Sequence, residues 1–227
     1  MAAKSATVAD KFLSFLKELS LDTKLPAGVK VMNPYRDPYT LGLCTTFYQK
    51  FYSDNNARTL LLGINPGRFG SGTTGISFTD PLKLEDICGI ANTLQKKPEL
   101  SADFIYRMIA AYGGHKSFYR SYLVSAISPL GFTKDGKNIN YYDIPALQKA
   151  VTPFIIKSIN ELSAMASPEK CFCIGEGKNF VFLEDLNQKH GWFKEIVPLP
   201  HPRFIMQYRR KKLGEYIDKY VSLLVTR

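Results

Sequence analysis

Residues 59–78 read TLLLGINPGRFGSGTTGISF and indicate the fold more directly than any other stretch of the chain. Residues 59–64 form a short apolar run, which is typical of a buried strand. Residues 63–75 hold five glycines, so backbone N–H groups there can approach a ligand closely. Residues 67–74 resemble a phosphate-binding P-loop, but Thr73 stands where that motif needs its lysine. The stretch predicts a strand followed by a ligand-binding loop and argues against an NTPase.

The same alternation of apolar runs and helical patterns continues along the chain. Further buried strands are expected at 122–127, 171–174 and 195–199. Helices are expected around Phe12, Leu16 and Leu19, at 101–111, from Pro145 towards Met165 with a kink or restart at Pro153, at 177–188 and at about 208–224. Strands that alternate with helices favour a parallel sheet with helices on both faces. We therefore predict an α/β protein, a three-layer α/β/α sandwich around a mainly parallel four-stranded sheet. It forms one domain over residues 1–227, with a flexible start of a few residues.

Polar and glycine-rich segments follow all four predicted strands. They are residues 63–67, 128–131, 175–178 and 200–203. In open α/β sheets, ligands bind outside the carboxyl ends of the strands. We therefore expect these four segments to converge on one site.

The last of these segments contains His201, one of three histidines in the chain. Pro200 and Pro202 flank it and restrict the backbone, which helps to aim the imidazole. A lone histidine is more often structural than catalytic, but its place after a strand favours a catalytic role. Residues 203–212 then carry five cations and no acid, interleaved with aromatic residues and Met206, a pattern suited to nucleic acid. The alternative is a solvated helix face.

The composition supports an anionic partner. The formal net charge is +10, from 30 Lys and Arg against 20 Asp and Glu, and nucleic acid is the usual partner of such a chain. No apolar run approaches the length that spans a bilayer, and the N-terminus lacks the apolar core of a secretory signal, so we expect a cytoplasmic protein and no membrane partner. The four cysteines have neither zinc nor iron–sulfur spacing and are expected to be buried thiols.

Taken together, these motifs resemble the uracil-DNA glycosylase superfamily, and most closely its single-strand-selective monofunctional branch. The first motif of that family, Gly-Met-Asn-Pro-Gly followed by Phe-Gly and Thr-Gly-x-x-Phe, is matched without a gap by residues 63–67, 69–70 and 74–78. The second motif begins His-Pro and is matched by His201-Pro202. The resemblance covers most of the chain from about Asn33 onward.

The resemblance implies a role for each matched residue. Asn65 would position the attacking water, and His201 would stabilise negative charge on the leaving base. Phe78 would stack on the extruded base, and the backbone of residues 67–70, which includes Gly67, Phe69 and Gly70, would line the pocket. Independently of the resemblance, Ser125 and Ser128 offer hydroxyls at the end of the second predicted strand that can help to bind the base. The basic and aromatic pattern predicts DNA contacts from Lys178, Arg203, Gln207, Tyr208, Arg209 and Arg210. The implied protein is a DNA-binding monomer that needs neither metal nor organic cofactor. It would release uracil or related damaged bases from single- or double-stranded DNA for base excision repair.

Two departures from the family pattern concern specificity and the wedge. The family's second strand carries an asparagine that reads the edge of uracil, and Ala126 stands at that position. The family also has Ser-Pro between His-Pro and its wedge arginine, whereas Arg203 follows Pro202 directly. Asp80, two residues beyond Phe78, is a rival for the role of catalytic base. Two other functions stay open: a non-catalytic binder of single-stranded nucleic acid, and an enzyme acting on free nucleosides.

Overall fold

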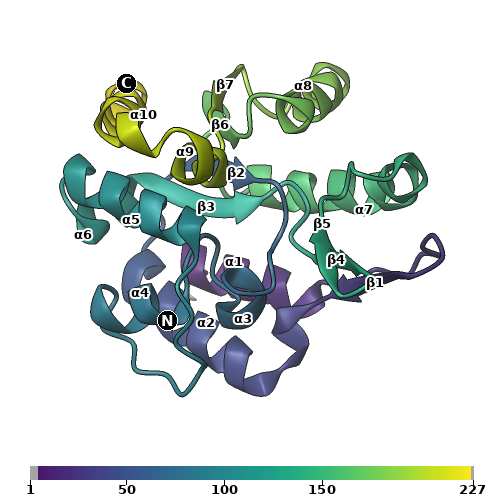
Figure 1. Cartoon of the computed structure of the whole chain (residues 1–227), viewed down its shortest axis with the longest axis horizontal. Helices are drawn as coiled ribbons and strands as arrows, with labels where there is room; N and C mark the ends of the chain where they lie inside the picture. Colours follow the sequence, from purple (N-terminus) through teal and green to yellow (C-terminus); the bar gives the residue numbers. More distant parts are fainter. Residues whose placement is uncertain (1–4, 226–227) are drawn as a thin grey trace.

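The central sheet is parallel and four-stranded, as the alternating pattern predicts. The computed structural model describes residues 5–225; the first four residues, where flexibility is expected, lie outside that range. The strand order is β3 (Tyr122–Ala126), β2 (Thr59–Gly63), β6 (Lys170–Ile174) and β7 (Glu195–Leu199) (Figure 1). These are the four predicted strands, and the α/β fold class is confirmed.

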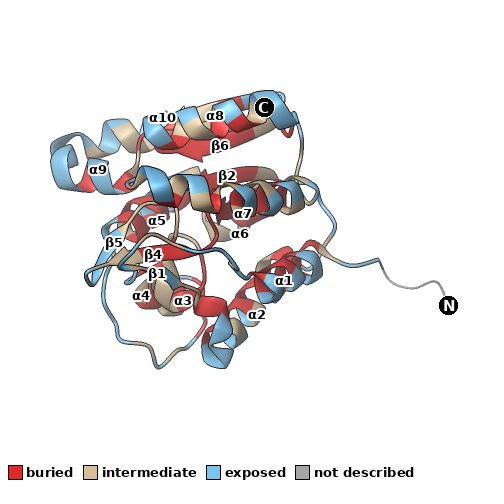
Figure 2. Ribbon diagram, turned by 90° about the vertical axis from the view of Figure 1, so that its right-hand side faces the viewer, coloured by how far each residue is buried: buried red, intermediate tan, exposed pale blue. Residues whose placement is uncertain are grey.

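Both faces of the sheet are covered by helices. Leu60, Leu61 and Leu62 are successive residues of β2 and are 0%, 1% and 0% exposed, although neighbouring side chains point to opposite faces. Figure 2 shows the sheet strands in the buried colour and the outward sides of the helices in the exposed colour. The helices and 3-10 turns of the described chain are α1 (Val8–Glu18), η1 (Pro34–Arg36), α2 (Pro38–Tyr52), α3 (Ser71–Thr74), α4 (Pro81–Asp86), α5 (Leu100–Tyr112), α6 (His115–Ser121), α7 (Pro145–Ser163), α8 (Lys178–His190), α9 (Pro202–Tyr208), η2 (Arg210–Lys212) and α10 (Leu213–Val225).

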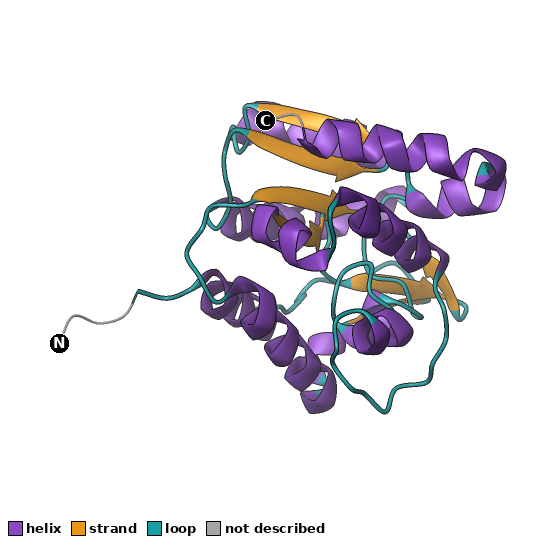
Figure 3. Ribbon diagram, turned by 90° about the vertical axis from the view of Figure 1, so that its left-hand side faces the viewer, coloured by secondary structure: helices purple, strands orange, loops and turns teal. Residues whose placement is uncertain are grey.

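A second, antiparallel sheet was not predicted from the sequence. It consists of β1 (Val29–Met32), β4 (Gly131–Lys134) and β5 (Lys137–Ile139), in the order β1-β4-β5. Its strands are only three or four residues long, so their alternation is too short to stand out. Figure 3 shows this sheet on the side to which the strands of the larger sheet point. It therefore stands beside the carboxyl ends where the site is expected.

The helices differ from the expected ones in two instructive places. Helix α7 runs without a break through Pro153, where a kink or restart is expected. Val151 and Ile155, on either side of the proline, are fully buried, and this packing holds the helix together across the missing hydrogen bond. The helix expected at about 208–224 begins later, at Leu213, and the separate helix α9, from Pro202 to Tyr208, precedes it. Proline at the first helical position is a start signal that the sequence contains.

All four cysteines are free and buried, as expected. Burial raises the pKa of Cys44 to about 12 and that of Cys88 to about 11, so neither is a thiolate at neutral pH. Cys171 and Cys173 lie in the central strand β6. These thiols therefore behave as small apolar core groups.

Gly75 offers a test of the packing beneath the glycine-rich loop. Its φ is +72°, and a Cβ there would lie 3.0 Å from Cγ2 of Thr40 and would collide with Sγ of Cys44. We expect Gly75→Ala to lower the free energy of unfolding by roughly 2–4 kcal/mol, from the left-handed backbone and the overpacking together.

The matched control is Gly42→Ala in the exposed part of α2, where nothing lies within 4 Å of an added Cβ. That change should stabilise the helix by about 0.5–1 kcal/mol. Urea unfolding of both variants and the parent measures the difference. Equal stabilities for the two variants would contradict the close packing around Gly75.

Candidate active site

A cleft of about 820 Å³ opens at the carboxyl ends of the parallel strands. Three of the four predicted segments line it: the loop after β2, the loop after β6, and the turn after β7. Residues 128–131 do not, because the chain there turns directly into β4; β3 contributes Ser125 and Ala126 instead. β5 and the segment after it supply a further wall, with Asn138 from the strand and Asn140 and Tyr142 from the segment.

Asn65 is held in one orientation by three backbone groups. Its Oδ1 accepts a hydrogen bond from the backbone N–H of Tyr141 at 3.0 Å. Its Nδ2 donates to the carbonyl oxygens of Ile139 and Pro66, each at 3.3 Å. Because an amide oxygen has two lone pairs, one acceptor site on Oδ1 is left for another donor. The small antiparallel sheet thus fixes an amide at the end of the large one.

Tyr141 connects this amide to the neighbouring strand. Its buried hydroxyl donates to Oδ1 of Asn179 at 2.9 Å, and Nδ2 of Asn179 donates to the carbonyl of Ile174, at the end of β6, at 3.1 Å. Burial raises the pKa of Tyr141 far above its usual value, so the phenol keeps its proton. The backbone N–H that orients Asn65 is therefore anchored through the Tyr141 side chain.

His201 lines the same cleft and is neutral. It caps the N-terminus of α9, with its Nδ1 accepting the backbone N–H of Arg203 at 3.2 Å. Burial, and secondarily the charge of Arg203, lowers the pKa of His201 from 6.5 to about 4. With Nδ1 acting as acceptor, the single proton of the neutral ring is on Nε2. His201 is thus a hydrogen-bond donor without a positive charge.

Phe78 forms a flat apolar wall of the cleft. Its φ is +52°, an uncommon backbone conformation for a residue with a large side chain. Thr74 and Thr79 hold the turn around it: the Thr74 hydroxyl donates to the Thr79 carbonyl at 2.7 Å, and the Thr79 hydroxyl donates to the Ser77 carbonyl at 3.1 Å. A Cβ on Gly63 would lie 2.8 Å from Cζ of Phe78, so the ring lies directly against the end of β2.

The other expected pocket residues divide into two groups. Gly67, Gly70 and Ser125 line the cleft. Ser128 does not: it is fully buried, and its hydroxyl donates to the carbonyl of Leu130 at 2.8 Å. Phe69 does not line the cleft either; its ring points outward and is 41% exposed.

The expected DNA-contacting residues are likewise only partly in the cleft. Lys178, Arg203, Gln207 and Tyr208 line it, whereas Arg209 and Arg210 lie outside, on the exposed surface after α9. Phe204 also lines the cleft, and Cζ of Arg209 lies 5.4 Å from the centroid of its ring. The sequence shows Phe204 among the cations but does not single it out as a site residue.

Asp80, the rival base, is engaged elsewhere. Its Oδ1 accepts the backbone N–H of Lys83 at 2.8 Å, and its Oδ2 accepts that of Glu99 at 3.0 Å. It is 1% exposed and is not among the cleft residues. Asp80 therefore caps α4 and ties it to the start of α5.

Within residues 5–225 there is no group of three or more His, Cys, Asp or Glu side chains arranged to hold a metal ion. Over the same range, no helix combines the length and apolar character required to cross a membrane.

Comparison with known proteins assigns the family. The family model of the uracil DNA glycosylase superfamily matches residues 49–225. The chain belongs to the uracil DNA glycosylase superfamily. The crystal structure of wild-type SMUG2 from Pedobacter heparinus superposes with a TM-score of 0.94 at 47% sequence identity, over 96% of this chain and 97% of that one. No match was found among curated proteins.

Asn65, Phe78 and His201 share one cleft, and other residues hold their side chains in place. Tyr141 and Asn179 were missed by sequence reasoning, although Asn179 follows the predicted 175–178 segment directly. The signal for Tyr141 was the dipeptide Asp135-Gly136, with φ values of +50° and +68°, which forms the β4–β5 turn. A hairpin there brings residues 139–141 back to the end of β2.

Tyr141→Phe tests whether the anchored phenol acts through Asn65. We expect the single-turnover base-excision rate to fall roughly 10-fold with DNA affinity unchanged, because small misplacements of a positioned group are costly. In an Asn65→Ala background the same change should have little further effect, since residues that act as a unit are non-additive.

Tyr52→Phe is the matched control, because it removes a buried phenol that donates to the Tyr122 carbonyl at 3.1 Å outside the cleft. It should lower stability without changing the excision rate. If Tyr141→Phe lowers the excision rate by the same factor in the parent and in the Asn65→Ala background, Tyr141 acts only on the fold.

Proposed function

We propose that the protein is a monofunctional glycosylase that hydrolyses the N-glycosidic bond of uracil, and of some related damaged bases, in DNA and leaves an abasic site for base excision repair. The observation that carries this proposal is the pairing, in one cleft, of a backbone-locked amide at Asn65 with a neutral imidazole donor at His201. We further propose that it acts as a monomer in the cytoplasm.

The locked amide suits the placement of water. An N-glycosidic bond breaks through a state in which the sugar resembles an oxocarbenium ion, so the incoming water needs position more than a strong base. Oδ1 of Asn65 accepts one bond from Tyr141 and keeps a lone pair to accept a proton of that water. Three backbone bonds keep the amide from rotating away.

His201 suits the departing base. As the bond breaks, negative charge develops on the base, and a fixed donor aimed at it is worth most where water is excluded. The Nε2–H of neutral His201 can donate to a base oxygen while Nδ1 keeps its hydrogen bond from the backbone N–H of Arg203. Phe78 offers the flat surface on which the base stacks. The base must leave the helical stack to reach this cleft, at a cost of a few kcal/mol that phosphate contacts offset.

The test is excision from oligonucleotides that carry one uracil, with abasic sites revealed by alkali. Asn65→Ala and His201→Ala should each lower the single-turnover rate by about 10²–10³-fold, the usual effect of removing one fixed polar group of this kind. DNA affinity, measured by fluorescence anisotropy, should fall much less. EDTA should not abolish the reaction, and no strand cleavage should occur without alkali.

The alternatives give different results in the same assay. A non-catalytic binder would retain uracil-containing DNA without releasing any base, and a nucleoside enzyme would act on free deoxyuridine as fast as on DNA. Loss of the reaction in Asp80→Asn together with its retention in Asn65→Ala would overturn the assignment of Asn65.

The pH dependence separates a neutral from a charged His201. Because its pKa is lowered to about 4, the imidazole is uncharged throughout pH 5–8. The excision rate should therefore show no step near pH 6.5 and should decrease only as the pH falls towards 4, where the ring gains a proton. The measurement is the single-turnover rate as a function of pH, with the His201 tautomer followed by ¹⁵N NMR. A rate that decreases as the pH rises through 6.5 would mean that the imidazolium is the active form.

Ala126 makes the base pocket permissive. It pairs with Gly63 across the β2–β3 ladder and lines the cleft, so it stands next to the Phe78 wall without a polar group. A site built around a side-chain amide rejects mismatched bases because its own polar groups would be left unpaired, and alanine imposes no such penalty.

Ala126→Asn should therefore narrow the range of excised bases towards uracil. The measured quantity is the ratio of single-turnover rates for uracil and for each other deaminated or modified base, in the parent and in the variant. Strict specificity for uracil in the parent would contradict the permissive pocket.

A further inference from the structure

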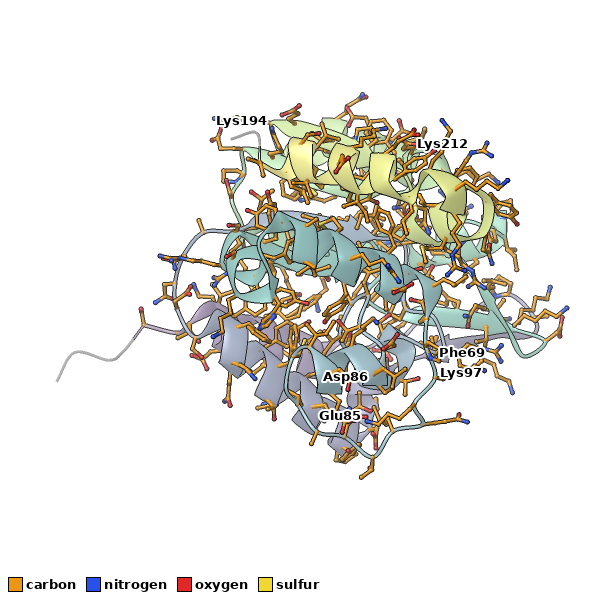
Figure 4. All side chains as sticks on the ribbon, turned by 60° about the vertical axis from the view of Figure 1, so that its left-hand side comes forward. Phe69, Glu85, Asp86, Lys97, Lys194 and Lys212 are labelled. Carbon is orange, nitrogen blue, oxygen red and sulfur yellow. The ribbon has the colours of Figure 1, made fainter. Side chains whose placement is uncertain are left out.

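Phe69 is an exposed aromatic residue at the edge of the cleft. Its neighbours Gly67 and Gly70 line the cleft, while the Phe69 ring faces outward and is 41% exposed. Two cations surround it: Nζ of Lys97 lies 3.7 Å and Cζ of Arg68 lies 5.1 Å from the ring centroid. Figure 4 labels Phe69 and Lys97 next to each other at the margin of the molecule. An aromatic ring and two charges are thus presented together to solvent.

The two cations have no acidic partner among residues 5–225. No carboxylate in that range lies within 4.0 Å of either Arg68 or Lys97. Two nearby acids have other partners: Glu85 pairs with Lys96, and the Glu99 carboxylate accepts the backbone N–H of Ala102. The charge beside the ring is therefore available to an anion.

The loop that carries Phe69 is held firmly. The backbone N–H of Arg68 donates to Oδ1 of Asn138 at 3.3 Å, and the Arg68 carbonyl accepts from the Thr73 hydroxyl at 2.7 Å. The Gly72 N–H donates to the Gly67 carbonyl at 2.8 Å, which closes the turn. The Phe69 ring is therefore held in the solvent by a turn with its own hydrogen bonds. A ligand that covers the ring would bury its apolar surface and gain free energy from that burial.

A similar arrangement borders the same cleft on α9. Phe204 and Tyr208 are 42% and 67% exposed, their rings are 5.7 Å apart, and Arg209 lies over Phe204. Two exposed aromatic–cation clusters thus flank the cleft that receives the base. A chain with alternating flat bases and phosphates matches both clusters: bases stack on the rings and phosphates pair with the cations.

Resting on the function proposed above, we propose that Phe69, Arg68 and Lys97 form a stacking site for an unpaired base that neighbours the target nucleotide. The base stacks on the face of the Phe69 ring opposite Lys97, and its phosphate lies against Lys97 and Arg68. A paired neighbour is held in the duplex by its hydrogen bonds to the partner base and by stacking on the next base pair, so this site engages only an unpaired one. The surface therefore increases affinity for single strands.

Binding to single-stranded DNA without uracil tests this surface independently of catalysis. Phe69→Leu keeps an apolar side chain but removes the aromatic face, and it should weaken binding roughly 5- to 100-fold, whereas Phe69→Tyr should bind as the parent does. Binding to fully paired duplex should not change. Unchanged single-strand affinity in Phe69→Leu, or an equal loss on duplex, would overturn the proposal.

An abasic spacer locates the stacked base. In the parent, a spacer at one particular position beside the target should weaken binding as Phe69→Leu does, and in Phe69→Leu the same spacer should have no further effect. A spacer effect that is identical in both proteins would exclude stacking on Phe69.

The salt dependence of binding tests whether Lys97 contacts a phosphate. Lys97→Gln should flatten the log–log salt dependence of single-strand binding by about 0.7, the contribution of one phosphate contact. Lys157→Gln, an exposed lysine on α7 outside the cleft, changes the net charge equally and should leave the slope unchanged. Equal slopes for the two variants would exclude a phosphate at Lys97.

These results separate the two proposals. Binding that depends on Phe69 in a protein that releases no base would support the stacking site and refute the glycosylase function. Normal excision together with parent-like binding in Phe69→Leu would support the glycosylase function and refute the stacking site.

Discussion

The close approach of the Phe78 ring to Gly63 is the constraint around which the cleft is organised. No side chain fits at position 63, because a Cβ there would lie 2.8 Å from the ring. The ring in turn needs the left-handed backbone of Phe78, which the Thr74 and Thr79 hydroxyls stabilise. Strain of this kind persists only where surrounding contacts determine it, and it is concentrated at functional sites. The glycine at the end of β2 and the threonines of the loop thus belong to one packing arrangement.

The sequence alone predicts the large sheet well, for a physical reason. Runs such as Leu60–Leu62 are buried on both faces, so they are apolar without interruption and easy to identify. The small sheet was missed because strands of three or four residues are too short to show a comparable apolar run. Helix α7 continues through Pro153 because tertiary packing outweighs local propensity.

The site shows the same division. Asn65 and His201 follow predicted strands, so their presence in one cleft follows from topology. Side-chain direction does not follow from topology: Ser128 turns inward to Leu130, and Phe69 turns outward to solvent. Tyr141 was missed because it acts through its backbone N–H and depends on a hairpin whose one sequence signal is the Asp135-Gly136 turn. Sequence patterns place residues at sheet ends, whereas hydrogen bonds decide which of them face the ligand.

The hydrogen bonds that fix the Asn65 side chain also bear on how this enzyme can evolve. All three of its partners are main-chain groups: two carbonyls and one N–H. A substitution cannot delete a backbone carbonyl, so the side chains at Pro66 and Ile139 can change while both carbonyl groups that accept from Asn65 remain. A change in the number of residues between β4 and β5 is different, because it would shift the Ile139 carbonyl and the Tyr141 N–H relative to Asn65 without replacing any partner residue. Selection on this amide therefore acts on the length of the hairpin more than on its composition.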